Sequence, residues 1–157
     1  NYGANLSDYT VWLLERSIKT LSVRVNAQNQ NALDLAKFLD DNLLIKKVFY
    51  PGLENHFSHE IASKQMNGFG GMMSFEVTEK INSEDFVSDL KIISPTMSLA
   101  GVESSITSPS KTSHKKVDPQ IRKKLGISDN LLRFSVGIED IEDLMLDLDK
   151  SLKKNVR

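Results

Sequence analysis

The sequence contains no cysteine, which excludes disulfide bonds, thiolate catalysis and cysteine-ligated metal sites. A cysteine-free chain suits a reducing compartment, and we expect a cytoplasmic protein. No run of about 18 apolar residues is present, so the sequence predicts no membrane-spanning segment. A strong charge of either sign is also lacking, because the net charge is only -1. That balance gives no electrostatic reason to expect a nucleic acid or an anionic membrane as partner.

What the sequence does contain is the composition of one globular domain, with 157 residues, 39% apolar and 26% charged. A chain of this length buries enough surface to form a hydrophobic core of its own. Its first residues, Asn1 to Ala4, show neither a starting methionine nor a signal-peptide pattern. We therefore expect the chain to be a piece of a longer protein.

The first expected element is one long helix over residues 7–40. Ser7 is a typical N-cap, and Asp8 in the first turn complements the helix dipole. A helix of this length that leads into a compact module is expected to link two domains. Its apolar residues recur at the spacing of one helix face: Leu14, Ile18, Leu21, Val25, Ala32, Leu35 and Leu39.

Short elements of alternating type follow the long helix. The patterns predict strands at 46–50, 71–77 and 131–136, and helices at 59–66, 83–90, 119–125 and from Asp140 onward. Residues 94–114 have no clear periodicity and are expected to form a long irregular loop. This order of helices and strands predicts an α/β fold, more specifically an α+β two-layer sandwich. Helices would cover one face of a mostly antiparallel sheet.

Arg133 is the most notable polar residue of the predicted strands. Strand alternation along residues 131–136 places it on the face opposite to Leu132 and Phe134. A planar guanidinium there can bind a carboxylate or phosphate through two parallel hydrogen bonds. A solvated or salt-bridged arginine on an open sheet face would give the same pattern.

Other polar clusters favour ordinary structure. The small, polar segment 98–104 could bind an anion through its hydroxyl and backbone N–H groups, but a connecting loop has the same composition. Residues 68–71 are rich in glycine but precede a strand, whereas phosphate-binding glycine loops open a helix. His56 and His59 have no third ligand at usable spacing, so no metal site is expected. The basic stretch 111–124 contains no aromatic residue on which a base could stack.

Several segments together resemble one known family. Residues 3–21 resemble the start of that family's C-terminal domain, and the segments 50–53 (YPGL) and 68–72 (GFGGM) resemble its next landmarks. Segment 98–104 (SLAGVES) is similar to its Ser-Leu-Gly-Gly loop, and 132–140 (LRFSVGIED) resembles its closing signature. The family is the Cys/Met-metabolism group of pyridoxal-phosphate (PLP) enzymes, which includes cystathionine γ-synthase, cystathionine β- and γ-lyase and methionine γ-lyase. The resemblance covers nearly the whole chain.

The resemblance implies roles for three residues. Arg133 matches the arginine that binds the α-carboxylate of the amino-acid substrate, and Ser98 matches a loop serine that helps to hold this carboxylate. Ser113 falls where the family often has a threonine near the substrate. The resemblance also implies the fold of the C-terminal small domain of fold-type I PLP enzymes, and a homotetramer for the full-length protein.

Two positions depart from the family pattern, and one group is absent. Ala100 stands in the usual Gly-Gly pair and adds a methyl group where backbones approach closely. Met97 is apolar where a subset of the family has glutamate. None of the lysines matches the family's Schiff-base lysine, so we expect PLP to be bound by a preceding large domain. No residue of this chain is then expected to be catalytic, and the chain alone is expected to be inactive.

The expected organisation follows from these inferences. Residues 1–40 would form the linking helix and residues 41–157 the α/β module that binds the substrate carboxylate, with the cofactor-lysine domain absent. The whole protein would catalyse elimination or γ-replacement on sulfur amino acids or O-acylhomoserine in Cys/Met metabolism. Its partners would be the amino-acid substrate, its own cofactor domain and further copies of itself, with no nucleic acid and no membrane. A stand-alone, non-enzymatic module for binding small carboxylates or for assembly is the alternative.

Overall fold

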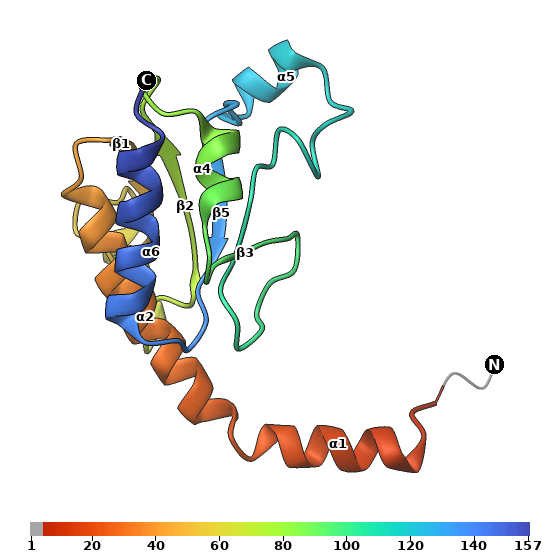
Figure 1. Cartoon of the computed structure of the whole chain (residues 1–157). Coiled ribbons are helices and arrows are strands. Elements are labelled where there is room, and N and C mark those ends of the chain that lie inside the picture. The colour runs from red at the N-terminus through yellow and green to blue at the C-terminus, as the bar shows by residue number, and fades with distance from the viewer. Residues whose placement is uncertain (1–4) are drawn as a thin grey trace.

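The structure, a computed structural model, describes residues 5–157 (Figure 1). Predictions that concern residues 1–4 lie outside this range. Among the described residues, one five-stranded sheet is flanked by helices, and an N-terminal arm extends away from this body. No helix of the described residues is both long and apolar enough to cross a membrane.

The sheet has the strand order β1-β2-β5-β4-β3. Three neighbouring pairs are antiparallel and only β3 and β4 run parallel, which confirms the prediction of a mostly antiparallel sheet. The strands are β1 (Ile45–Phe49), β2 (Met72–Val77), β3 (Ser94–Pro95), β4 (Ser105–Thr107) and β5 (Leu131–Ser135). The prediction of an irregular segment over 94–114 is therefore wrong in part, because β3 and β4 form one edge of the sheet.

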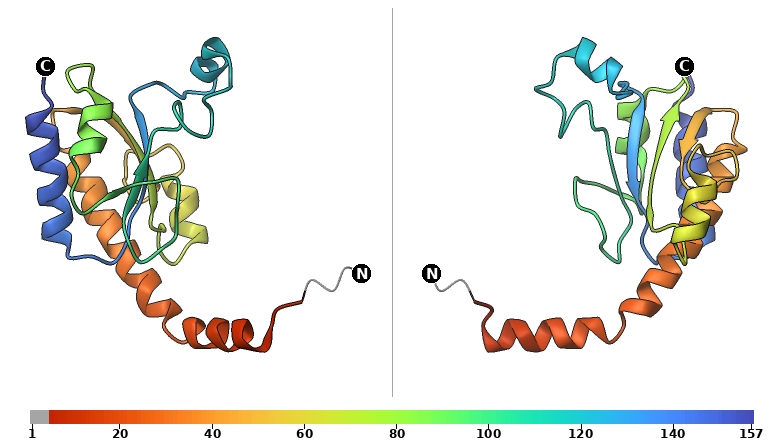
Figure 2. Two further views of the ribbon diagram at one scale, coloured as in Figure 1. Left: turned by 45° about the vertical axis from the view of Figure 1, so that its right-hand side comes forward. Right: turned by 180° about the vertical axis from the view of Figure 1, so that it is seen from behind.

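The expected single helix over residues 7–40 is two helices, α1 (Asp8–Ile18) and α2 (Leu21–Asp40). Side chains at the junction satisfy backbone carbonyls that a continuous helix would use. The Ser17 hydroxyl donates to Leu13 O at 2.8 Å, and the Thr20 hydroxyl donates to Ser17 O at 3.3 Å. Such local bonds compete with the helical ladder and bend the chain. Figure 2 shows α1 turned away from the body.

The remaining helices are α3 (His59–Gln65), α4 (Ser83–Asp89), α5 (Pro119–Lys124) and α6 (Ile141–Lys154). Ser7, the predicted N-cap, caps α1 by accepting from Thr10 N. Asp140 caps α6 by accepting from Glu142 N and Asp143 N. Gly126 follows α5 with a φ of +74°, a conformation that glycine adopts without steric cost.

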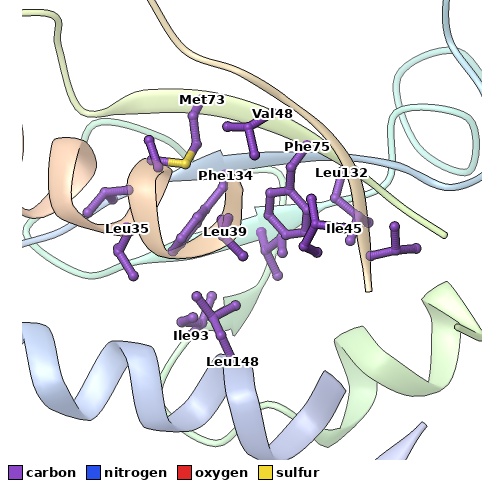
Figure 3. Close-up of a cluster of buried hydrophobic side chains, with 14 of the residues drawn as sticks. Leu35, Leu39, Ile45, Val48, Met73, Phe75, Ile93, Leu132, Phe134 and Leu148 are labelled. Carbon is purple, nitrogen blue, oxygen red and sulfur yellow. The ribbon is translucent and has the colours of Figure 1, made fainter. Parts of the chain in front are cut away.

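Helices α2, α4 and α6 cover one face of the sheet, as predicted (Figure 1). Between them and the sheet lies a core in which Phe75 stands edge-on to Phe134, with ring centroids 6.4 Å apart (Figure 3). Burying each large apolar side chain of this kind stabilises the fold by roughly 1.5–3 kcal/mol. The fully buried core residues include Leu35, Leu39, Tyr50, Phe75, Phe86, Ile93, Ile106, Leu132, Phe134, Leu144, Leu148 and Leu152.

Only the second half of the predicted apolar helix face is buried. Leu35 and Leu39 on α2 are fully buried, whereas Leu14 and Ile18 on α1 are 50% and 56% exposed. Helix α1 contains no buried residue at all. The arm therefore makes its apolar stripe available at the surface of this chain.

Candidate functional site

The face of the sheet opposite the helices presents Arg133 at the centre of a polar row. The residue is half-buried, and in the antiparallel register its Cα partners are Ser74 on β2 and Thr107 on β4. Directly paired residues project on the same side of a sheet, so two hydroxyl side chains flank the guanidinium. Strand alternation predicted this face for Arg133, and the structure confirms it.

A loop over residues 96–104 covers the Arg133 side chain. Arg133 Nη2 donates to Met97 O at 2.7 Å and to Ser98 O at 3.3 Å. Arg133 Nε is buried and has no hydrogen-bond partner among the described residues. One end of the guanidinium is thus fixed by the loop, while the N–H group of Nε lacks the acceptor that a buried donor requires. The guanidinium forms no ion pair with a carboxylate of the described residues, so its charge can still be balanced by a bound anion such as a carboxylate.

Ser98 reaches Arg133 through its backbone rather than through its hydroxyl. The Ser98 carbonyl accepts both from Arg133 and from Ser105 Oγ, the latter at 2.7 Å. The Ser98 side chain itself is exposed. Segment 98–104 therefore connects two strands and also binds the Arg133 guanidinium through a backbone carbonyl.

Ser113 is not in hydrogen-bond contact with Arg133 or Ser98. It is exposed, and its hydroxyl lies 2.9 Å from His114 Nδ1. The hydroxyl residue paired with Arg133 on this side is Thr107, whose hydroxyl lies 3.2 Å from that of Thr112. Of the three predicted site residues the structure brings Arg133 and Ser98 together, and it adds Thr107 and Ser74. Sequence reasoning would have found Thr107 only by recognising the three-residue strand β4.

Three further hydrogen bonds anchor the loop. The Ala100 N–H donates to Ser135 Oγ at 2.9 Å, and Gln28 Nε2 on α2 donates to Gly101 O at 2.7 Å. The Ile138 N–H donates to Val102 O at 2.9 Å. Ala100 takes a φ of +61°, which agrees with the expectation that glycine is the usual residue at this point. The loop is thus fixed from α2, from β5 and from the turn after β5.

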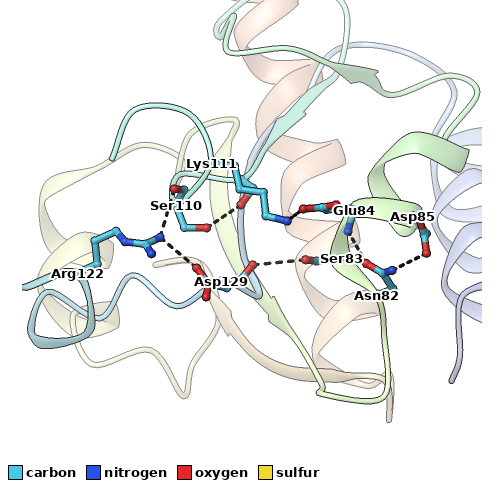
Figure 4. Close-up of polar contacts among 9 residues, drawn as sticks. Asn82, Ser83, Glu84, Asp85, Ser110, Lys111, Arg122 and Asp129 are labelled. Carbon is cyan, nitrogen blue, oxygen red and sulfur yellow. Dashed lines mark hydrogen bonds and ion pairs between the residues drawn. The ribbon is translucent and has the colours of Figure 1, made fainter. Parts of the chain in front are cut away.

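The basic stretch 111–124 joins the polar contacts at the far end of the sheet (Figure 4). Lys111 forms an ion pair with Glu84 on α4. Arg122 Nη1 donates to Asp129 Oδ1 at 3.0 Å and to Ser110 O at 3.2 Å. These cations hold the segment after β4 against the body of the domain.

The two neighbouring histidines, His56 and His59, make hydrogen-bond contacts with the surrounding chain. His59 Nδ1 lies 2.8 Å from Pro51 O, and the His59 ring stacks on Phe69. Burial, followed by the charges of Lys47 and His59, lowers the pKa of His56. Among residues 5–157, no group of three His, Asp or Glu side chains is placed to hold a metal ion.

The Arg133 site does not fit PLP itself. A PLP site needs a lysine amine for the aldehyde and protein groups that tune the ring nitrogen. Among the described residues, no lysine amine hydrogen-bonds to Arg133 or to loop 96–104, and the site's one cation is the guanidinium. Its donors instead suit a small carboxylate.

Solved structures share this fold. The chain matches the crystal structure of cystathionine γ-lyase from Lactobacillus plantarum complexed with L-serine with a TM-score of 0.89 and 38% identity, covering 96% of this chain and 40% of that one. It matches cystathionine γ-synthase from Xanthomonas oryzae pv. oryzae in complex with cystathionine with a TM-score of 0.86 and 38% identity, covering 94% and 38%. The class is thus an α/β domain of the kind found in fold-type I PLP enzymes.

Sequence comparison defines the family within that class. The profile of the Cys/Met metabolism PLP-dependent enzymes matches residues 1–153. Cystathionine β-lyase of Lactococcus lactis subsp. cremoris (strain MG1363) is 45% identical over 152 residues, 97% of this chain, and cystathionine γ-lyase of Bacillus subtilis (strain 168) is 42% identical over 151 residues, 96% of it. The chain belongs to this family, and it spans about 40% of the length of these relatives.

Proposed function

We propose that this chain is the C-terminal, substrate-carboxylate-binding part of a PLP-dependent enzyme of Cys/Met metabolism. The whole enzyme would act by elimination or γ-replacement on sulfur amino acids or O-acylhomoserine. One observation carries the proposal: Arg133 lies on the sheet face opposite the helices, its Nη2 is fixed by the loop, and its guanidinium has no ion pair among the described residues. The cystathionine lyases and synthases among the relatives support the substrate class.

In this proposal the carboxylate of the amino acid is the counter-charge of the Arg133 guanidinium. Charge-assisted bonds between a guanidinium and a carboxylate are short and directional, so they fix the orientation of the bound molecule. Loop 96–104, with Ser98, holds the guanidinium in place and removes its need to reorganise on binding. Ser113 would line the same site from the segment after β4, close to the bound substrate.

The organisation belongs to the same proposal. Residues 1–40 would link the module of residues 41–157 to a separate domain that binds PLP, and the whole protein would assemble as a homo-oligomer. PLP supplies the electron sink in this family, so this chain alone would bind and orient substrate without turning it over.

The test replaces Arg133 with alanine in the full-length protein and measures turnover of L-cystathionine. Loss of a charge-assisted pair to a carboxylate costs roughly 2–4 kcal/mol, so KM should rise by about 30-fold or more. Arg157→Ala is the matched control, because the backbone of Arg157 binds Lys80 O, whereas the Arg133 side chain binds the carbonyls of Met97 and Ser98. An unchanged KM in Arg133→Ala would remove the role given to this residue.

A further inference from the structure

A buried polar clamp joins the loop over Arg133 to the turn that follows β5. Ser104, at the end of the loop, is fully buried. Its N–H donates to Glu139 Oε1 at 2.5 Å, and its hydroxyl donates to Glu139 Oε2 at 2.9 Å. The same hydroxyl oxygen accepts from Gly137 N at 2.9 Å. One serine thus satisfies both carboxylate oxygens of Glu139 and one backbone donor.

The clamp lies where the two parts of the Arg133 site meet. Gly137 lies two residues after the end of β5, the strand that bears Arg133. Ser104 ends the loop whose carbonyls bind the Arg133 guanidinium. The approach is close, since a Cβ placed on Gly137 would lie 2.3 Å from Val102 O. The clamp is thus one of the contacts that hold the loop against the strand that bears Arg133.

Glu139 is held by donors rather than by a cation. Within residues 5–157 it has no ion pair, and its partners are the two donor groups of Ser104. It directly precedes Asp140, the N-cap of α6, where the helix dipole favours negative charge. Both Ser104 groups donate to the carboxylate, and an amide in its place would lose the negative charge that strengthens these two hydrogen bonds.

Helix α2 supports the same clamp from the other side. Asn31 Nδ2 donates to Glu139 O at 2.9 Å and to Gly137 O at 3.3 Å, and Gln28 binds Gly101 O. The contacts of the clamp converge on loop 96–104.

We propose that Glu139 is a positioning residue for the carboxylate site. Through Ser104 its carboxylate holds loop 96–104 where the carbonyls of Met97 and Ser98 orient the Arg133 guanidinium. The proposal rests on the function given above, in which Arg133 binds the substrate carboxylate.

The test compares Glu139→Gln with Glu142→Gln in the full-length protein. Glu142 is exposed three residues further along, so this control removes the same charge without touching the clamp. KM for L-cystathionine should rise by about 10-fold in Glu139→Gln while kcat stays within about twofold, the signature of lost substrate binding without lost chemistry. Hydrogen exchange at the amides of Ala100 and Ser104 should also quicken. Glu142→Gln should change none of these.

Ser104→Ala provides a second route to the same clamp if Glu139→Gln does not fold. It should give the same rise in KM, and the double variant should add little, because both changes break one unit. A normal KM in Glu139→Gln or Ser104→Ala, together with a raised KM in Arg133→Ala, would overturn the positioning role alone. A kcat that falls with KM unchanged would overturn it too. A normal KM in Arg133→Ala would overturn the proposed function itself.

Discussion

For Arg133, the sequence predicts the face of the sheet on which the side chain lies but not the groups that it contacts. Alternation with Leu132 and Phe134 fixed its face, because a strand must bury one side against helices. Its direct partners could not be foreseen, since Met97 and Ser98 contact it through carbonyl oxygens, which every residue carries. The arginine was therefore predictable from the sequence, whereas the loop carbonyls that orient its guanidinium were not.

Ala100 is a residue held in a conformation that suits glycine. At a φ of +61° its methyl group crowds the following carbonyl, which costs roughly 1–2 kcal/mol. Replacement by glycine removes this cost, but it also raises the conformational entropy of the unfolded chain, which offsets part of the gain. We expect Ala100→Gly to raise the free energy of unfolding by about 0.5–1 kcal/mol. Urea denaturation checks this, with Ala27→Gly inside α2 as a control that should lower it by about 1 kcal/mol. A destabilised Ala100→Gly would contradict the strain argument.

Tyr50 links stability to alkaline pH. It is fully buried, donates to Gly70 O at 2.8 Å, and burial raises the pKa of its phenol from 10.0 to about 12. The pKa of Tyr50 is higher in the folded than in the unfolded state, so the neutral phenol contributes to the free energy of unfolding. This contribution is complete below pH 10 and is lost as the pH rises from 10 to about 12. The loss amounts to about 2–3 kcal/mol.

Tyr50→Phe isolates this effect. It removes the bond to Gly70 O and should cost about 1 kcal/mol at neutral pH, but it cannot ionise. Unfolding free energies measured between pH 8 and 11 should therefore fall more steeply for the wild type than for the variant. Parallel curves would show that another group governs alkaline unfolding.

At the scale of elements, Asp147 on α6 ties the chain to the start of β3. Its carboxylate is buried and accepts from Lys91 N at 2.9 Å, Ile92 N at 2.9 Å and Ile93 N at 3.1 Å. A carboxylate is an acceptor for all three donors, whereas an asparagine amide would face some of them with its own N–H groups. This contact places the short edge strand beside β4.

We expect Asp147→Asn to lower the free energy of unfolding by about 2–3 kcal/mol. Asp149→Asn on the same helix is the control, because Asp149 forms only a surface pair with Lys153 and should change stability by less than about 0.5 kcal/mol. Chemical denaturation of both variants measures the difference. Equal stabilities would mean that the backbone donors at 91–93 are satisfied without the carboxylate.

Elements with full periodic patterns were predictable, and short or interrupted ones were not. Strand β5 and helix α6 are each long enough for the periodic spacing of their buried residues to appear in the sequence. Both lie where this spacing predicted them. Strands β3 and β4 have two and three residues, too few for alternation to appear. The break between α1 and α2 depends on the Ser17 and Thr20 hydroxyls, which leave the apolar spacing unchanged.

At the scale of the whole molecule, the arm and the body differ in what they bury. Tyr9 and Trp12 on α1 are 68% and 54% exposed, with ring centroids 6.0 Å apart. Apolar patches of this kind mark surfaces that contact another part of a protein. The body, in contrast, has a hydrophobic core of its own and carries the Arg133 site. This division agrees with a chain that spans about 40% of the length of its relatives.

The most direct test of the account compares two inhibitors of the full-length enzyme, L-serine and ethanolamine, which differ only in the carboxylate. With wild-type protein, L-serine should inhibit about 30-fold or more better than ethanolamine, because its carboxylate pairs with the Arg133 guanidinium. With Arg133→Ala this preference should nearly disappear, while Arg157→Ala keeps it. An Arg133→Ala enzyme that still prefers L-serine to the same degree would contradict the assignment of the carboxylate to Arg133.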